Sequence, residues 1–203
     1  MGQTDNILPR QKKGASSDTR FLVNSDSETK AAELLSRARQ RLLDVNNWHV
    51  YAGSGALFSL VNKRGEECKG PAEEGNYFRI TIPLVPGTSE GEGDEWVEVE
   101  KIEEGKKEHR EYIALRVRPA SPPFPHHNST AHFFSKDATS TFSIIRNGRK
   151  VIASVSGRNE IPNTDTENFS SKLRNLVVAV GAMVGLNKPQ WKKLVKGLLT
   201  HQD

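Results

Sequence analysis

The chain is poor in cysteine, in apolar residues and in long apolar runs. It has one cysteine, Cys68, among 203 residues, so no disulfide can form within it and a reducing, cytoplasmic location is expected. No stretch approaches the ~20 apolar residues of a membrane-spanning helix, and Met1 to Arg20 lacks the apolar core of a secretory signal. Apolar residues make up 35% of the chain, which suffices for one hydrophobic core. These features predict a single domain with no membrane span.

Catalytic signatures are also missing. The sequence contains no Gly-rich phosphate loop, no dinucleotide-binding fingerprint and no Gly-x-Ser-x-Gly elbow. His126, His127 and His132, with Asp137 nearby, could offer ligands to a transition metal. Adjacent histidines point in different directions, however, and these lie in a proline-rich stretch. The sequence therefore predicts no metal site and no cofactor, and it leaves any catalytic residue unknown.

Charge is unevenly distributed along the chain. The net charge is +4, but the stretch from Glu90 to Glu111 holds ten acidic and four basic residues and so carries −6, leaving +10 for the rest. Basic residues gather near Arg10 and between Lys188 and Lys196. Such clusters can bind phosphate backbones, yet no aromatic stripe interleaves with them as a single-strand binder would require. Nucleic acid is therefore not an expected partner.

Two capping boxes predict two amphipathic helices. Ser25 to Glu28 (SDSE) precedes apolar residues at helical spacing from Ala31 to Leu42. Thr164 to Glu167 (TDTE) precedes a longer apolar stripe that predicts a helix from Asn168 to Val184. The first helix should end near Asn46-Asn47, where Trp48 is expected to seal one end of the core.

The region between these helices is typical of antiparallel strands. Asn147-Gly148 lies between two alternating runs and predicts a two-residue type I′ hairpin, with Ile144 opposite Val151 and Phe142 opposite Ala153. One face of this hairpin is apolar and the other carries Ser and Thr, so the sheet should have one buried and one solvated side. The other expected strands are Arg20–Asn24, Ala56–Val61, Tyr77–Leu84, Trp96–Ile102 and Tyr112–Arg118, the last two joined by a charged tip at 103–110.

This order of elements predicts an α+β fold in which a curved antiparallel sheet grips a long C-terminal helix. It resembles the helix-grip fold of the START-related and pollen-allergen superfamily, through the element order, the 168–184 helix and the Asn47-Trp48 step. The START-like domain is expected over residues 20–185. A disordered polar tail, 1–19, should precede it and a short basic helix should follow within 186–203.

The resemblance implies a cavity between the concave sheet and the long helix that holds a lipid, a sterol-like or an aromatic molecule. It would be lined by inner-face residues: Leu115, Val117, Phe142, Ala153 and Val155 of the sheet, and Leu173, Val177 and Val180 of the helix. The same residues could instead fill a dry core, because core packing and pocket lining use the same apolar side chains.

The sequence leaves three functions open. The first is a carrier or sensor of a small apolar ligand. The second is an interaction module with a filled core, which would bind a partner or itself through an exposed patch around Trp191 and the last helix. The third is an enzyme of the cyclase or hydrolase kind, which requires polar groups such as Tyr77, Arg79 or His132 to converge inside the cavity.

Overall fold

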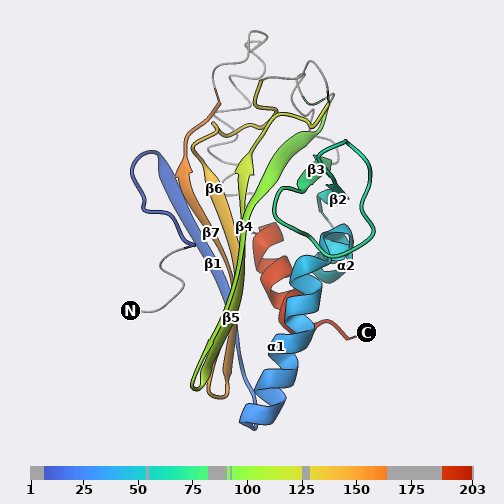
Figure 1. Ribbon diagram of the computed structural model, residues 1–203. Helices are drawn as coiled ribbons and strands as arrows, with labels where there is room; N and C mark the ends of the chain where they lie inside the picture. Colours follow the sequence, from blue (N-terminus) through green and yellow to red (C-terminus); the bar gives the residue numbers. More distant parts are fainter. Residues whose placement is uncertain are drawn as a thin grey trace.

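The computed structural model describes residues 7–53, 55–81, 91, 93–124, 129–163 and 189–202. Seven antiparallel strands form one curved sheet, in the order β1-β7-β6-β5-β4-β3-β2 (Figure 1). Their bounds are β1 Ala15–Asn24, β2 Leu57–Val61, β3 Tyr77–Thr81, β4 Glu95–Lys107, β5 Arg110–Pro119, β6 Thr139–Asn147 and β7 Lys150–Glu160. The helical segments are α1 Glu28–Leu43, the 3₁₀ turn η2 Val45–Asn47, α2 Trp48–Ala52 and residues 189–200.

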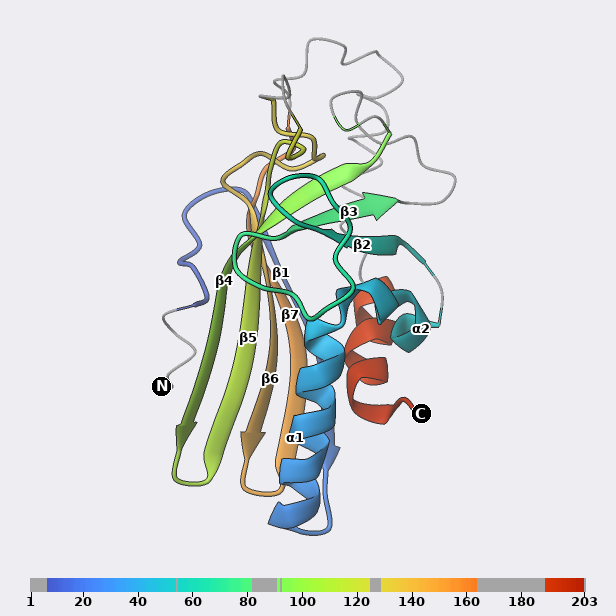
Figure 2. The ribbon, with the colours of Figure 1, turned by 45° about the vertical axis from the view of Figure 1, so that its right-hand side comes forward.

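The helices cover one face of the sheet. Figure 2 shows α1 and the 189–200 helix side by side on that face, with β2 and β3 crossing above them. The predicted fold class, a curved antiparallel sheet gripping a C-terminal helix, is confirmed. The predicted helix from Asn168 to Val184 and its capping box lie outside the described residues. Within the ranges described, no helix is long and apolar enough to cross a membrane.

Helix α1 begins two residues later than the predicted capping box implied. Ser27, rather than Ser25, is the N-cap, and its Oγ accepts a hydrogen bond from the Lys30 N–H at 3.1 Å. The Ser25 N–H donates to the Arg149 carbonyl at 2.9 Å, at the end of β1, so it does not make the reciprocal bond to Glu28 that the predicted capping box requires. The predicted apolar stripe of the helix is correct: Ala31, Leu34, Leu35, Ala38 and Leu42 are all buried.

The chain from Ile7 to Thr19 is ordered against the sheet, so the predicted disordered tail is too long. Strand β1 begins at Ala15 and pairs with β7 from Ala15↔Glu160 to Asn24↔Lys150. Before it, the Lys12 and Lys13 N–H groups donate to Asn159 Oδ1, at 2.8 and 3.3 Å. The segment is polar and has low β-propensity, so only the partner strand, which no local pattern reveals, places it in the sheet.

The β6–β7 hairpin has the predicted faces but a different register. Asn147 pairs with Lys150, so the two loop residues are Gly148 and Arg149, and Ile144 faces Ala153 instead of Val151. Gly148 is the first central residue and has φ +58°, which is where a type II′ turn needs glycine. This register differs from the predicted one by two positions, which preserves the alternation of faces. The apolar face is therefore buried as predicted, through Phe142, Ile144, Val151, Ala153 and Val155.

Strands β4 and β5 are longer than their apolar alternation suggested. The predicted charged tip at 103–110 is mostly paired strand, and Lys107↔Arg110 closes the hairpin. Cross-strand pairing of opposite charges makes a charged strand acceptable on the solvated face.

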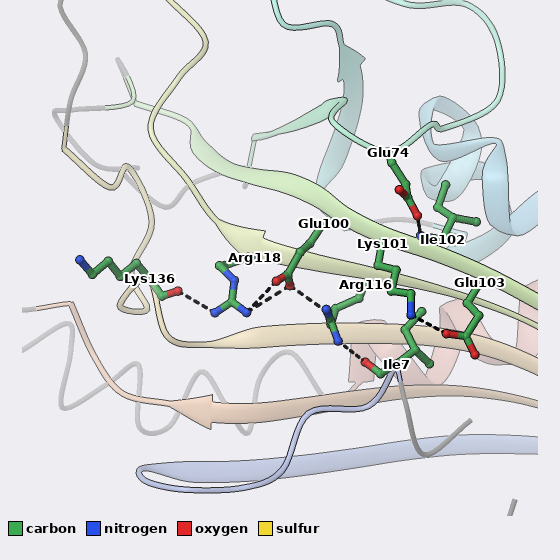
Figure 3. A network of polar contacts seen from close by, with 9 residues as sticks. All are labelled: Ile7, Glu74, Glu100, Lys101, Ile102, Glu103, Arg116, Arg118 and Lys136. Atoms are coloured by element: carbon green, nitrogen blue, oxygen red, sulfur yellow. Dashed lines mark hydrogen bonds and ion pairs between the residues drawn. The ribbon is translucent and has the colours of Figure 1, made fainter. Parts of the chain in front are cut away.

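Arginines of β5 neutralise the acidic residues of β4 across the sheet. Glu100 accepts hydrogen bonds from Arg116 Nε at 2.8 Å and from Arg118 Nη2 at 3.0 Å (Figure 3). Arg116 Nη1 also donates to the Ile7 carbonyl at 2.7 Å, and Arg118 Nη1 donates to the Lys136 carbonyl at 3.1 Å. This network ties the N-terminal segment to the outer face, where Ile7 is only 1% exposed.

The 189–200 helix is part of the same core as the sheet. Leu194, Val195, Leu198 and Leu199 are buried in the main hydrophobic cluster. The buried guanidinium of Arg41 donates to the carbonyls of Leu198, at 3.3 Å, and His201, at 2.8 Å, which satisfies acceptors at the helix end. These apolar side chains face inward, while Trp191 is half-buried, and a protein partner for this helix stays a prediction.

The substitution Gly197→Ala tests whether the 189–200 helix packs against α2, because helix propensity and packing predict stability changes of opposite sign. A methyl group at Gly197 would overlap the backbone carbonyl of Tyr51. Alanine normally stabilises a helix interior by about 1 kcal/mol relative to glycine, so a freely exposed helix would gain stability from Gly197→Ala. We expect instead a lower free energy of unfolding in urea titrations. Lys196→Ala, at the exposed neighbouring position, should leave the stability nearly unchanged. A stabilised Gly197→Ala protein would mean that the helix does not pack against α2.

Candidate functional site

A cavity of about 70 Å³ lies between the inner face of the sheet and the start of the 189–200 helix. One buried water needs about 10–15 Å³ on this scale, so the space exceeds that of a single water. Its walls come from distant parts of the sequence. The described residues that line it are Ser17, Thr19, Ala56, Phe58, Phe78, Ile80, Val97, Val117, His132, Phe133, Phe134, Ser140, Phe142, Glu160, Gln190 and Trp191.

Aromatic rings form one side of this cavity. Phe142 of β6 meets Trp191 edge-on with ring centroids 5.4 Å apart, and Phe58 of β2 lies 6.3 Å from Trp191. Behind them, the fully buried Trp48 contacts Phe58, Phe78 and Phe142 at centroid distances of 5.2, 5.6 and 4.6 Å. Such tilted and edge-to-face contacts add stability beyond the area they bury, so the aromatic wall is held in place by its own packing.

The other end of the cavity is polar. Ser17 and Thr19 come from β1, Ser140 from β6 and Glu160 from the end of β7. The Ser17 hydroxyl donates to Glu160 Oε1 at 3.0 Å. A mostly apolar pocket with a few polar groups at one end is the usual composition of a small-molecule site.

His132 belongs to this wall and is held by its surroundings. The Phe134 N–H donates to His132 Nδ1 at 2.9 Å, and Asn163 Nδ2 donates to the His132 carbonyl at 3.1 Å. The next residue, Phe133, donates its N–H to Glu95 Oε2 at 2.7 Å. The imidazole also packs against the rings of Phe133 and Phe134, with centroids 4.3 and 5.8 Å away.

Burial controls the protonation of His132. The side chain is 7% exposed, and desolvation by burial lowers its pKa from 6.5 to about 3. The ring is therefore neutral at physiological pH. Because Nδ1 accepts a hydrogen bond, the proton of the neutral ring is on Nε2.

The five sheet residues that the sequence predicted to line the ligand cavity divide into two groups. Val117 and Phe142 line the cavity. Leu115, Ala153 and Val155 are buried in the main core cluster and are not part of its lining. The helix residues Leu173, Val177 and Val180 lie outside the described residues. Whether any of these residues contacts a ligand stays a prediction.

The polar groups named for an enzyme do not converge. His132 reaches the cavity, but Tyr77 packs beside Val61, Trp96 and Ala131 in a second cluster. Arg79 forms an ion pair with Glu67 at 3.0 Å. The structure therefore brings one of the three groups to the site.

The histidine cluster considered as a metal site is not assembled in the part of the chain that is described. Asp137 forms an ion pair with Lys13 at 2.6 Å, while His126 and His127 lie outside the described residues. Across the described ranges, no group of three His, Cys, Asp or Glu side chains is placed to hold a metal ion.

Comparison with known proteins gives fold-level similarity only. No protein-family profile matches the sequence, and no curated protein matches it. A hypothetical protein from Helicobacter pylori is similar in structure, at 11% identity and a TM-score of 0.49, over 89% of this chain and 86% of that chain. A truncated norcoclaurine synthase from Thalictrum flavum has 9% identity and a TM-score of 0.42, over 96% and 100%. A START superfamily protein from Mycobacterium smegmatis has 12% identity and a TM-score of 0.34, over 89% and 99%.

The predicted resemblance to the START-related and pollen-allergen superfamily therefore stays a similarity in the order of helices and strands. At these identities and TM-scores it says nothing about ligand or activity.

His132 predicts an acid-dependent loss of stability. Its folded-state pKa is about 3 and its ordinary value is 6.5, so the unfolded state takes up a proton first as the pH falls. The contribution of the neutral ring is complete above pH 6.5 and is lost between pH 6.5 and 3. We expect His132 to account for about 2 kcal/mol of the stability lost between pH 7 and pH 5.

The contribution of His132 is measured by urea unfolding of the native protein and of His132→Asn at pH 7 and at pH 5. Asparagine can keep the acceptor for the Phe134 N–H without titrating. The variant should therefore lose about 2 kcal/mol less stability than the native protein between pH 7 and pH 5. Equal losses in the two proteins would show that His132 is not buried in its neutral form.

Proposed function

We propose that this protein binds a small, largely apolar molecule in the cavity between the sheet and the 189–200 helix. The observation that carries the proposal is a space of about 70 Å³ beside side chains that are otherwise tightly buried. An empty cavity lowers stability, by roughly 24 cal/mol for each Å³ in core-truncation series. Aromatic walls with a polar end make the same space useful for binding.

The composition of the wall supports a compact ring-containing ligand. Phe58, Phe78, Phe142 and Trp191 present ring faces and edges that favour aromatic or alicyclic groups. The space of about 70 Å³ is smaller than the roughly 150 Å³ of an engineered cavity that binds benzene, so a ring-containing ligand must displace part of this wall on binding.

Two other functions receive less support. A neutral His132 with a pKa of about 3 is a poor general base near pH 7, and Tyr77 and Arg79 lie elsewhere, so an enzyme would need a different set of groups. Binding of a protein through the last helix would need apolar side chains on its surface, and Leu194, Val195, Leu198 and Leu199 are buried.

Two equally buried valines test the proposal. Val117 and Val155 are each 4% exposed, but only Val117 lines the cavity. We expect Val117→Phe to abolish binding of α-methylstyrene, an apolar probe, because the added ring occupies the cavity. Binding is measured by titration of the isotope-labelled protein, followed by NMR.

Val155→Phe is the matched control. It should lower stability by about 1–3 kcal/mol, because it overpacks the core, while its folded molecules still bind the probe. Unchanged binding by Val117→Phe, or no binding to the native protein up to the solubility of the probe, would refute the proposed cavity function.

A further inference from the structure

We infer that the ligand carries a neutral hydrogen-bond acceptor, such as a ketone, ester or ether oxygen, and that His132 Nε2–H donates to it. This inference rests on the proposed function and adds the chemical class of the ligand. It starts from a donor on a buried residue of the cavity wall. His132 lines the cavity and is 7% exposed, and its Nε2 has no hydrogen-bond partner among the residues that the structure describes.

The direction of the hydrogen bond is fixed by the backbone. The Phe134 N–H occupies Nδ1 at 2.9 Å, so Nδ1 cannot carry the proton of the neutral ring and Nε2 must be a donor. Packing against Phe133 and Phe134 restricts rotation of the ring. A residue that lines the cavity therefore carries a donor whose position is set before any ligand arrives.

A buried donor needs an acceptor. Buried polar groups in native proteins are almost always hydrogen-bonded to protein, water or ligand, because an unsatisfied one costs free energy. A ligand oxygen at Nε2 would satisfy His132 while the rest of the molecule contacts the aromatic wall.

The acceptor should be uncharged. Burial keeps the imidazole neutral, so it offers no positive charge to offset the desolvation of a carboxylate or phosphate in an apolar cavity. The expected class is thus a small aromatic or alicyclic compound with one carbonyl or ether oxygen, rather than a hydrocarbon or a fatty-acid anion.

Acetophenone and α-methylstyrene form a matched pair of probes, since they share one shape and differ in C=O against C=CH₂. The preference for acetophenone is the ratio of the two Kd values, measured for the native protein and for His132→Asn. We expect the substitution to reduce that preference by about 2- to 10-fold, mainly by weakening acetophenone. Asparagine can keep the Phe134 contact but is too short to replace Nε2–H.

His132→Gln is the rescue variant. Its longer side chain can place an amide N–H near the position of Nε2, so it should restore part of the preference. A second measurement uses the native protein alone and follows the NMR resonances of the His132 Nε2 nitrogen and its proton. These resonances should shift when acetophenone is added and move much less with α-methylstyrene.

The outcomes separate the two claims. If both probes bind but His132→Asn leaves their ratio unchanged and the Nε2 resonances do not respond to acetophenone, the inference about His132 is wrong and cavity binding stands. If neither probe binds the native protein, the proposed function itself fails.

Discussion

The structure depends on the burial of Trp48. Its ring is fully buried and packs against Phe58, Phe78 and Phe142, which belong to β2, β3 and β6. Its Nε1 donates to the Arg41 and Leu42 carbonyls at 3.2 and 3.1 Å, at the end of α1. One side chain therefore joins the helix end, the two short strands and the long part of the sheet. The cavity lies against the same aromatic layer, so its shape depends on this contact.

Much of the fold follows from local patterns, and the errors occur where a distant partner decides the structure. The alternation of apolar residues correctly predicted that Phe142 and Ile144 lie on the buried face. The predicted strand register was wrong, but a shift of two positions leaves each side chain on the same face. Turn residues did not fix which two positions form the loop. The ordered segment before Thr19 was missed, because its hydrogen bonds go to Asn159 and β7, which are far away in sequence.

The candidate site is harder to predict than the fold because lining and core residues obey the same alternation. Val117 and Leu115 both face inward, yet only Val117 reaches the cavity. A usable signal was present in the polar residues: Thr19 of β1 and Ser140 of β6 occupy inner-face positions, where the apolar alternation of their strands stops. His132 was named with Tyr77 and Arg79 as a group for the cavity, but strand alternation could not single it out, since loop contacts with Phe134 and Asn163 hold it in place.

The central claim is that the cavity holds a small apolar molecule, and native mass spectrometry of gently purified protein tests it most directly. We expect a discrete added mass that is released on denaturation and identified in the extract as a compact, uncharged compound with a ring. A bare mass that stays bare after incubation with neutral aromatic and lipid-like compounds, acetophenone included, would contradict it and indicate a filled core.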